Sequence, residues 1–300
     1  ADGAVMREML NISVGECLYG FGEKFSTFVK NGQTVEVWNN DGGTSSEQSY
    51  KCIPFYITSN KYGVLVNTAD KVSFEVASDT INKVSFTVPG EELDYFFIGG
   101  ENLEEVLVNY TDLTGKSVML PKAALGYLGS SMYYPELPEN SDDAVLEFID
   151  TTHEEDIPVD GFQLSSGYCA VETEQGIKRC TFTWNHKRFK DPADWFAQME
   201  KRGIVVSPNI KPGMLLVHPL LNEMKEKGMF LPASDDNAGL DGLAVGTWWG
   251  GPGLFVDFTK QSTREHWKQY IKDALLRYGC RSLWNDNLSL IHISEPTRPY

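Results

Sequence analysis

The stretch Tyr278-Gly279-Cys280-Arg281-Ser282-Leu283-Trp284-Asn285-Asp286-Asn287 runs through apolar positions into the acid Asp286. It follows residues 261–278, whose amphipathic pattern predicts a helix. A helix followed by a strand that ends on a carboxylate is typical of a βα barrel, whose sites lie at the C-terminal ends of the strands. Asp286 is therefore the lead candidate for a catalytic group. The alternative for a lone Asp at a strand end is a helix cap or a loop residue.

The residues before this stretch alternate between strand and helix patterns. The predicted strands are 124–129, 159–164 and 204–210, and the predicted helices are 141–155, 191–202 and 218–227. The run Ser141-Asp142-Asp143 is expected to cap the first of these helices. Alternation at this spacing predicts parallel strands, and with the strand that ends at Asp286 there are four.

The first third of the chain has a different periodicity. Short runs between Gly15 and Ile98 alternate apolar and polar residues, with turn residues between them. This pattern predicts an antiparallel β-sandwich domain over residues 1–115, incomplete at its start. The six predicted strands are 34–38, 54–58, 63–67, 72–76, 84–88 and 95–98. Residues 102–114 predict a linking helix.

Composition narrows the classes of partner. The formal net charge is −16, whereas nucleic acids and anionic membranes bind clustered Lys and Arg, so both are excluded as expected partners. Neutral sugars remain compatible with this charge. Seven Trp and thirteen Tyr residues offer rings on which sugars could stack.

Cysteine and histidine spacing predicts neither a disulfide framework nor a metal or cofactor site. Five widely spaced cysteines form no Cys-x-x-Cys pair, which favours a reducing, cytoplasmic location. The histidines His153, His186 and His218 lack metal-ligand spacing. No signal-peptide pattern or bilayer-length apolar run occurs. Because the chain begins in mid-pattern at Ala1, secretion stays open.

Four blocks occur in the order in which a known family carries them. They are Tyr19-Gly20-Phe21-Gly22-Glu23, then Phe182-Thr183-Trp184-Asn185 with Phe189-Lys190-Asp191-Pro192, then the segment 251–259 with its Asp257-Phe258-Thr259 run, and finally Trp284-Asn285-Asp286-Asn287. Together they resemble glycoside hydrolase family 31, which contains α-glucosidases, α-xylosidases and their relatives. In that family the Asp of the last block attacks the anomeric carbon of the sugar.

The resemblance implies a fold and a mechanism. The fold would be a β-sandwich followed by a (β/α)8 TIM barrel, of which residues 116–287 form the first half, because four strands cannot close the barrel. The activity would be retaining hydrolysis of terminal α-linked sugars in oligosaccharides or other α-glycosides. Retention needs two carboxyl groups about 5 Å apart. Asp286 is the implied nucleophile, while the family's acid/base lies on a later strand, so this fragment is expected to be inactive.

Residues 288–300 depart from the family pattern. The family places another Asn or Met and then Glu after Asn287, whereas this chain continues Leu288-Ser289-Leu290-Ile291-His292-Ile293. This segment back-translates to a transposon-end adapter used in sequencing libraries. It is therefore expected to be a non-native read-through tail that does not form a barrel element. The alternative is a genuine short loop.

The resemblance also implies substrate-binding residues around Asp286. Asp41 corresponds to a family Asp that contacts sugar hydroxyls, Trp249 to an aromatic that stacks on the sugar, and Trp284 lies in the nucleophile block. The alternatives are a turn at Asp41 and a packing role for Trp249. These side chains are expected to meet Asp286 in one pocket.

Ser165 and Lys211 stand where many family members hold an Asp that accepts hydrogen bonds from sugar hydroxyls. A Lys side chain cannot accept a hydrogen bond at all. Both residues are still expected at the substrate site. Because they differ from the glucose-type pattern, α-xylosides, α-galactosides and N-acetylated α-glycosides stay open as substrates.

Two other functional classes remain open. A carbohydrate-binding or structural protein without catalysis would present aromatic platforms and no carboxylate at the barrel mouth. A βα-barrel lyase or aldolase would need a buried Lys at a strand end to form a Schiff base. Lys211 is the candidate for that role, but the following Pro212 favours a loop over a buried amine. Arg281 is expected to be a solvent-exposed or strand-end group.

Overall fold

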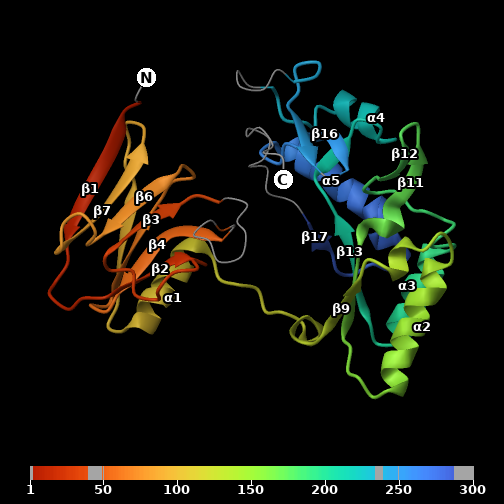
Figure 1. Cartoon of the computed structure of the whole chain (residues 1–300), viewed down its shortest axis with the longest axis horizontal. Helices are drawn as coiled ribbons and strands as arrows, with labels where there is room; N and C mark the ends of the chain where they lie inside the picture. The colour runs from red at the N-terminus through yellow and green to blue at the C-terminus, as the bar shows by residue number, and fades with distance from the viewer. Residues whose placement is uncertain (1–2, 40–48, 50, 234–238, 249, 287–300) are drawn as a thin grey trace. The chain divides into compact units, whose positions relative to one another are not determined.

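A computed structural model describes residues 3–39, 49, 51–233, 239–248 and 250–286 of the chain. Two units can be distinguished, Ala1–Val118 and Met119–Tyr300, and Figure 1 traces both by residue number. Asp41, Trp249 and the 288–300 segment lie outside the described residues.

In the described part of the first unit, the strands form two four-stranded antiparallel sheets (Figure 1). The first sheet has the order β1 (Val5–Asn11), β7 (Lys83–Pro89), β6 (Val72–Val76) and β3 (Gln33–Val37). The second has the order β2 (Leu18–Gly22), β4 (Cys52–Thr58), β5 (Tyr62–Val66) and β8 (Tyr95–Gly99). All six predicted strands are therefore present, within one or two residues at each end.

The two sheets share one apolar core, which makes the unit a β-sandwich as predicted. Phe74 of β6 is fully buried, and its ring centroid lies 4.8 Å from that of Phe21 in the opposite sheet and 5.8 Å from that of Phe86. Rings at these separations contribute packing beyond the area they bury. Strand β1 was not predicted, because it is mostly exposed and lacks the alternation that marks a half-buried strand.

The first family block forms the end of β2 and requires glycine. Gly22 has a φ of +84°, a left-handed conformation that side chains with a Cβ rarely adopt. A Cβ on Gly22 would lie 1.8 Å from the backbone oxygen of Lys51, so even alanine would clash there. The pairing of β2 with β4 also shifts register between Gly20 and Gly22. The block therefore has a structural reason in this unit.

Helix α1 (Leu103–Thr114) follows the sandwich, as predicted. Asn102 caps it, because its side-chain oxygen accepts the backbone N–H of Glu105 at 2.8 Å. The helix buries Val106 and stacks Tyr110 on Phe55 of β4, with ring centroids 4.1 Å apart. These contacts attach α1 to the second sheet.

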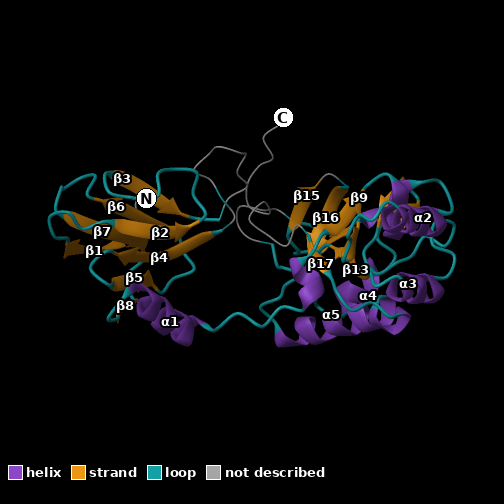
Figure 2. Cartoon of the chain, turned by 90° about the horizontal axis from the view of Figure 1, so that it is seen from below, coloured by secondary structure: helices purple, strands orange, loops and turns teal. Residues whose placement is uncertain are grey.

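The described part of the second unit is built on four parallel strands. Their order is β17 (Trp284–Asn285), β13 (Val205–Ile210), β10 (Gly161–Leu164) and β9 (Leu128–Ser131). Between them run α2 (Ser141–Glu154), α3 (Pro192–Lys201), α4 (Leu221–Glu226) and α5 (Gln261–Ala274). Figure 2 shows α3 and α5 along one side of these strands. The predicted α/β alternation is confirmed.

Short antiparallel strands are inserted between the parallel strands and helices, and the sequence analysis did not predict them. A hairpin of β11 (Ala170–Thr173) and β12 (Gly176–Arg179) follows β10. A three-stranded sheet combines β14 (Gly213–Leu215), β16 (Gly251–Phe255) and β15 (Val245–Trp248). Both insertions come after the C-terminal end of a parallel strand. In βα barrels that end carries the functional loops.

Residues 124–129, predicted as one buried strand, form two different structures. Lys122–Leu125 is a short 3-10 helix, and the strand starts only at Leu128. Leu125 is 76% exposed, so its apolar side chain misled the prediction. The predicted cap of α2 is also wrong. Its N-cap residue is Asn140, which has a φ of +55° and makes no side-chain capping bond.

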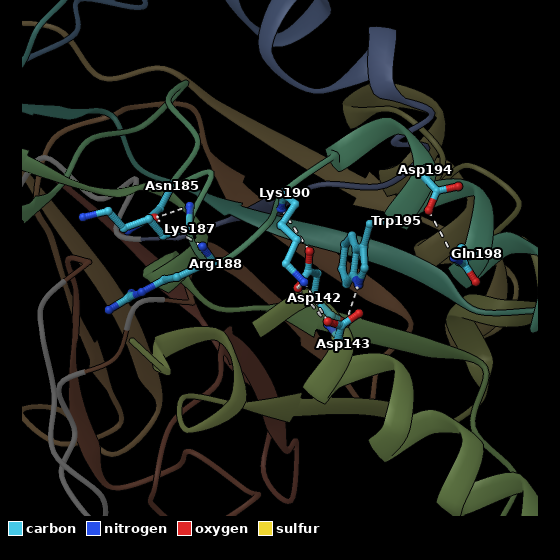
Figure 3. Close-up of polar contacts among 9 residues, drawn as sticks. All are labelled: Asp142, Asp143, Asn185, Lys187, Arg188, Lys190, Asp194, Trp195 and Gln198. Carbon is cyan, nitrogen blue, oxygen red and sulfur yellow. Dashed lines mark hydrogen bonds and ion pairs between the residues drawn. The ribbon is translucent and has the colours of Figure 1, made fainter. Parts of the chain in front are cut away.

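The start of α2 is held instead by the segment before α3 (Figure 3). Asp142 donates its backbone N–H to the backbone oxygen of Arg188 at 2.9 Å, and its carboxylate accepts the backbone N–H of Lys190 at 2.9 Å. Trp195 of α3 donates its indole N–H to the backbone oxygen of Asp142 at 3.1 Å. The family block around Lys190 therefore joins the first two barrel helices.

Candidate functional site

Three predicted site residues come directly after parallel strands. Ser165 follows β10, Lys211 follows β13 and Asp286 follows β17. The registers Leu164↔Pro208 and Ile210↔Asn285 bring the three strand ends to one edge of the sheet. The structure thus places these residues at the end of the sheet that carries the sites of βα barrels.

Asp286 is bound by two side chains of β13 and its loop. Its Oδ2 atom accepts a hydrogen bond from Asn209 Nδ2 at 2.8 Å and forms an ion pair with the ammonium of Lys211. Its backbone N–H donates to the backbone oxygen of Ile210 at 3.0 Å. The Asp286 side chain is 27% exposed and that of Lys211 only 6%. The carboxylate is therefore fixed from the protein side and reachable from solvent.

Lys211 is a buried amine, contrary to the loop that Pro212 suggested. The hydroxyl of Thr181 lies 3.4 Å from both the backbone N and the backbone O of Lys211. The bend at Pro212 thus occurs inside the unit, because the β11–β12 hairpin and the residues after it cover the strand end. The ammonium of Lys211 is engaged in the ion pair with Asp286.

His218, in its neutral form, holds Thr181, the residue that contacts the backbone of Lys211. Its Nδ1 atom accepts the backbone N–H of Leu220 at 3.1 Å, so the proton resides on Nε2, which donates to the backbone oxygen of Thr181 at 2.9 Å. Burial lowers the pKa of His218 to about 4, against the opposing effect of the hydrogen bond to Thr181. The ring is therefore held between Leu220 and Thr181, and through Thr181 it supports Lys211.

Asn209 was not predicted as a site residue, although it stands two residues before Lys211. Its side chain contacts Asp286, and its backbone oxygen accepts the hydroxyl of Tyr168 at 2.8 Å. Tyr168 is fully buried in the 3-10 turn Ser166–Cys169 that follows Ser165. The signal in the sequence that could have identified Asn209 was a polar residue near the end of a buried strand, because such positions are otherwise apolar.

Two polar atoms at this edge have no hydrogen-bond partner among the described residues. They are the hydroxyl oxygen of Ser165 and the side-chain oxygen of Asn209, and both are buried. An unsatisfied buried polar atom costs about 1–3 kcal/mol. Both atoms are therefore buried hydrogen-bonding groups at the strand ends whose partners lie outside the described contacts.

Of the other predicted residues, Trp284 and Arg281 lie among the described residues, and Asp41 and Trp249 do not. Trp284 lies in β17, half-buried, opposite Asn209 in the strand pairing. Arg281 is 73% exposed at its side chain and pairs with Glu200 at 2.7 Å, so it is a surface group as predicted. Asp41 and Trp249, which were expected to face Asp286, fall outside the described residues, and their roles stay predictions.

Other chemistries find little support at this edge. Burial raises the pKa of Cys169 to about 12 and that of Cys180 to about 11, so neither is a ready thiolate nucleophile. Within the described ranges, no three His, Cys, Asp or Glu side chains gather as a metal site would require. None of the helices in those ranges is long and apolar enough to span a membrane.

Sequence comparison assigns both units to known domains. Residues 117–299 match the glycosyl hydrolases family 31 TIM-barrel domain, and residues 2–75 match the glycosyl hydrolase 31 N-terminal galactose mutarotase-like domain. An α-xylosidase of Lactiplantibacillus pentosus is 38% identical over 94% of this chain, and an α-xylosidase of Emericella nidulans is 37% identical over 88%. The chain spans 35% and 32% of these two relatives, about a third of their length.

Solved structures agree with the sequence matches. The family 31 dextranase of Flavobacterium johnsoniae, solved with glucose, has a TM-score of 0.82 and 25% identity, over 95% of this chain and 34% of that one. The same dextranase has also been solved, as a mutant, with isomaltotriose. The sandwich, the parallel half-barrel and the four ordered blocks are thus those of one family. This chain belongs to glycosyl hydrolase family 31.

Proposed function

We propose that this chain is part of a retaining α-glycosidase in which Asp286 is the nucleophile. The observation that carries the proposal is the placement of the Asp286 carboxylate at the C-terminal edge of the parallel sheet. There Asn209 and Lys211 hold one of its oxygens while the side chain keeps access to solvent. A carboxylate that only caps a helix would need neither contact.

The chemistry requires a second carboxyl group. Asp286 attacks the anomeric carbon as the glycosidic bond breaks, and a carboxylic acid about 5 Å away protonates the departing oxygen. Water then cleaves the glycosyl ester, with the same group acting as base. We assign this acid/base to a later barrel strand of the longer enzyme, as in the family pattern, and to none of the carboxyl groups of this chain. The 300-residue chain should then be inactive alone.

The substrate is proposed to be a terminal α-linked sugar. Among its candidates, α-xylosides are favoured by the two relatives named α-xylosidase. Ser165 and Lys211 also differ from the paired carboxylates of the glucose-type pattern, which keeps α-galactosides and N-acetylated sugars as alternatives. Ser165 has a buried hydroxyl without a partner among the described residues and is proposed to bond a sugar hydroxyl. Asp41, Trp249 and Trp284 are proposed to complete the sugar site.

The test is covalent labelling of the full-length enzyme. A mechanism-based fluoroglycoside should trap a glycosyl ester, and peptide mapping should locate it on Asp286. The Asp286→Asn enzyme should lose turnover by about a thousand-fold or more, because the shape remains but the attacking oxygen is gone. The control is Asp257→Asn. Asp257 is a buried residue before α5 that binds Thr259 and Lys260, so it should carry no label in the unmutated enzyme. Label on another residue, or inversion at the anomeric carbon, would refute the assignment.

A further inference from the structure

We infer that Asn209 links the nucleophile to the substrate: its amide N–H holds Asp286, and its amide oxygen accepts the sugar hydroxyl next to the anomeric carbon. The role of Asn209 rests on the function proposed above. The geometry that points to it is the pair of side-chain atoms on this one residue, one bonded to Asp286 and the other buried without a partner among the described residues.

The orientation of the Asn209 amide is determined by its neighbours. The donor 2.8 Å from Asp286 Oδ2 is the amide nitrogen of Asn209, so the amide oxygen is its other, acceptor end. The backbone next to this side chain is anchored by the hydroxyl of Tyr168, which is fully buried. The amide oxygen is therefore held at a set position beside Asp286.

These contacts also assign roles to the two oxygens of Asp286. Oδ2 accepts from Asn209 and pairs with Lys211, whereas no described residue hydrogen-bonds Oδ1. Oδ1 is therefore the attacking oxygen. When the Oδ1–carbon bond forms and the glycosidic bond breaks, Oδ2 becomes the carbonyl oxygen of the ester. It can keep the Asn209 hydrogen bond throughout, so this donor needs no rearrangement during the reaction.

The free amide oxygen then specifies which sugar hydroxyl it meets. Asn209 lies one hydrogen bond away from Asp286, which points to the group on the ring carbon next to the anomeric carbon that Oδ1 attacks. That hydroxyl is a donor, and Asn209 offers an acceptor that has no other described partner. Hydrogen bonds at this position in glycosidases strengthen in the transition state.

The experiment measures discrimination between a substrate and its 2-deoxy analogue in the full-length enzyme. Nitrophenyl α-xyloside and α-glucoside both carry this hydroxyl, so the test does not depend on which is preferred. For each variant, kcat/KM for the substrate is divided by kcat/KM for its 2-deoxy analogue. Comparing this ratio between variants cancels the intrinsic reactivity of the deoxy sugar. Asn209→Ala should reduce this ratio by about tenfold, the effect of one lost hydrogen bond that strengthens in the transition state.

Two further variants keep the test decisive. Ser207→Ala removes a hydrogen bond of 2.8 Å from Ser207 to Ser282, near β17, and should leave the ratio unchanged. Asn209→Asp keeps the acceptor but loses the donor, so it should lower kcat and preserve the ratio within about threefold. If Asn209→Ala fails to fold, Asn209→Leu, which has a similar volume and no acceptor, is measured in its place and should reduce the ratio by the same factor.

The inference would be overturned if Asn209→Ala left the ratio of kcat/KM for substrate over 2-deoxy analogue unchanged. It would also be overturned if Asn209→Asp lowered that ratio as far as Asn209→Ala is expected to. In those cases a trapped water satisfies the amide oxygen instead of the sugar. Fluoroglycoside labelling of Asp286 in the unmutated enzyme is independent of both results. It separates a failure of this inference from a failure of the proposed function.

Discussion

The two units differ in how their described strands are arranged around a core. In the first unit two antiparallel sheets face each other, and both contribute rings to a single core around Phe74. In the described second unit the parallel sheet ends on β9 and β17, which have a strand on one side only. A (β/α)8 barrel pairs every strand on both sides. The described strands of the first unit therefore bury one core between two sheets, whereas those of the second form a single parallel sheet packed against helices.

The largest expected effect is on independent folding. Residues 1–118 alone should unfold cooperatively in urea, because the two described sheets bury one shared apolar core. Residues 119–300 alone, and the second unit within the 300-residue chain, should aggregate or stay molten, because open strand edges and uncovered apolar faces favour association. Urea titration followed by tryptophan fluorescence, with binding of an exposed-hydrophobe dye, checks both. A cooperative, dye-free transition of residues 119–300 would contradict the comparison.

Core packing should give the next largest effect. Phe74→Ala in residues 1–118 should lower the free energy of unfolding by about 3–5 kcal/mol, because a fully buried ring leaves a cavity between the sheets. The matched control is Phe97→Ala, since Phe97 is 63% exposed on β8 and should cost under about 1 kcal/mol. Equal losses for the two variants would mean that the sheets do not share one core.

The two units also differ in how far the sequence predicted them. Sandwich strands such as β6 alternate buried and half-buried residues, so their period of two was visible. The edge strand β1 escaped because exposure removes that alternation. In the second unit buried strands and helices were placed well. Exposed apolar residues such as Leu125 led to a wrongly predicted strand start, because hydrophobicity alone does not distinguish a surface turn from a buried strand.

At the site, the sequence predicted positions better than partners. Strand-end position pointed to Asp286 and the family pattern to Ser165 and Lys211, and a parallel sheet brings such positions together. The sequence did not reveal that Lys211 would be buried, because its contact is with Thr181, 30 residues earlier, which His218 holds in turn. Asn209 escaped because its role depends on a contact across strands. Asp41 and Trp249 rest on the family pattern alone.

The stability of the second unit should depend on pH through His218. Its pKa is about 4 in the fold and ordinarily near 6.5, so below pH 6.5 the unfolded state binds more protons. Stability should therefore fall between about pH 6.5 and 4, by about 3 kcal/mol in total, and not change with this group above pH 7. Urea unfolding of the full-length enzyme across this range measures the loss.

The control is His218→Gln, which retains a donor for Thr181 but does not titrate. The variant should remove this part of the pH dependence from the second unit and leave that of residues 1–118 as it was. If the slope between pH 6.5 and 4 is the same in both enzymes, His218 is protonated in the fold and its burial does not control stability.

Surface ion pairs should have the smallest effect, and the same one in both units. Lys190 pairs with Asp143 at 2.8 Å beside α2 (Figure 3), with side chains 55% and 68% exposed. Lys51 pairs with Glu23 at 2.9 Å in the sandwich, with side chains 70% and 67% exposed. Exposed pairs contribute about 0–1 kcal/mol, since water screens them and ordering long side chains costs entropy.

Lys190→Met and Lys51→Met should therefore each change the free energy of unfolding by less than about 1 kcal/mol. The backbone N–H of Lys190 still binds Asp142 in the variant, so the junction of α2 and α3 persists. Asp142→Ala removes that acceptor, which is 10% exposed, and should cost about 1–3 kcal/mol. Urea unfolding of the three variants, each against the unmutated protein, measures these differences. A Lys190→Met loss as large as that of Asp142→Ala would show that charge at the surface, and not the buried junction, distinguishes the half-barrel from the sandwich.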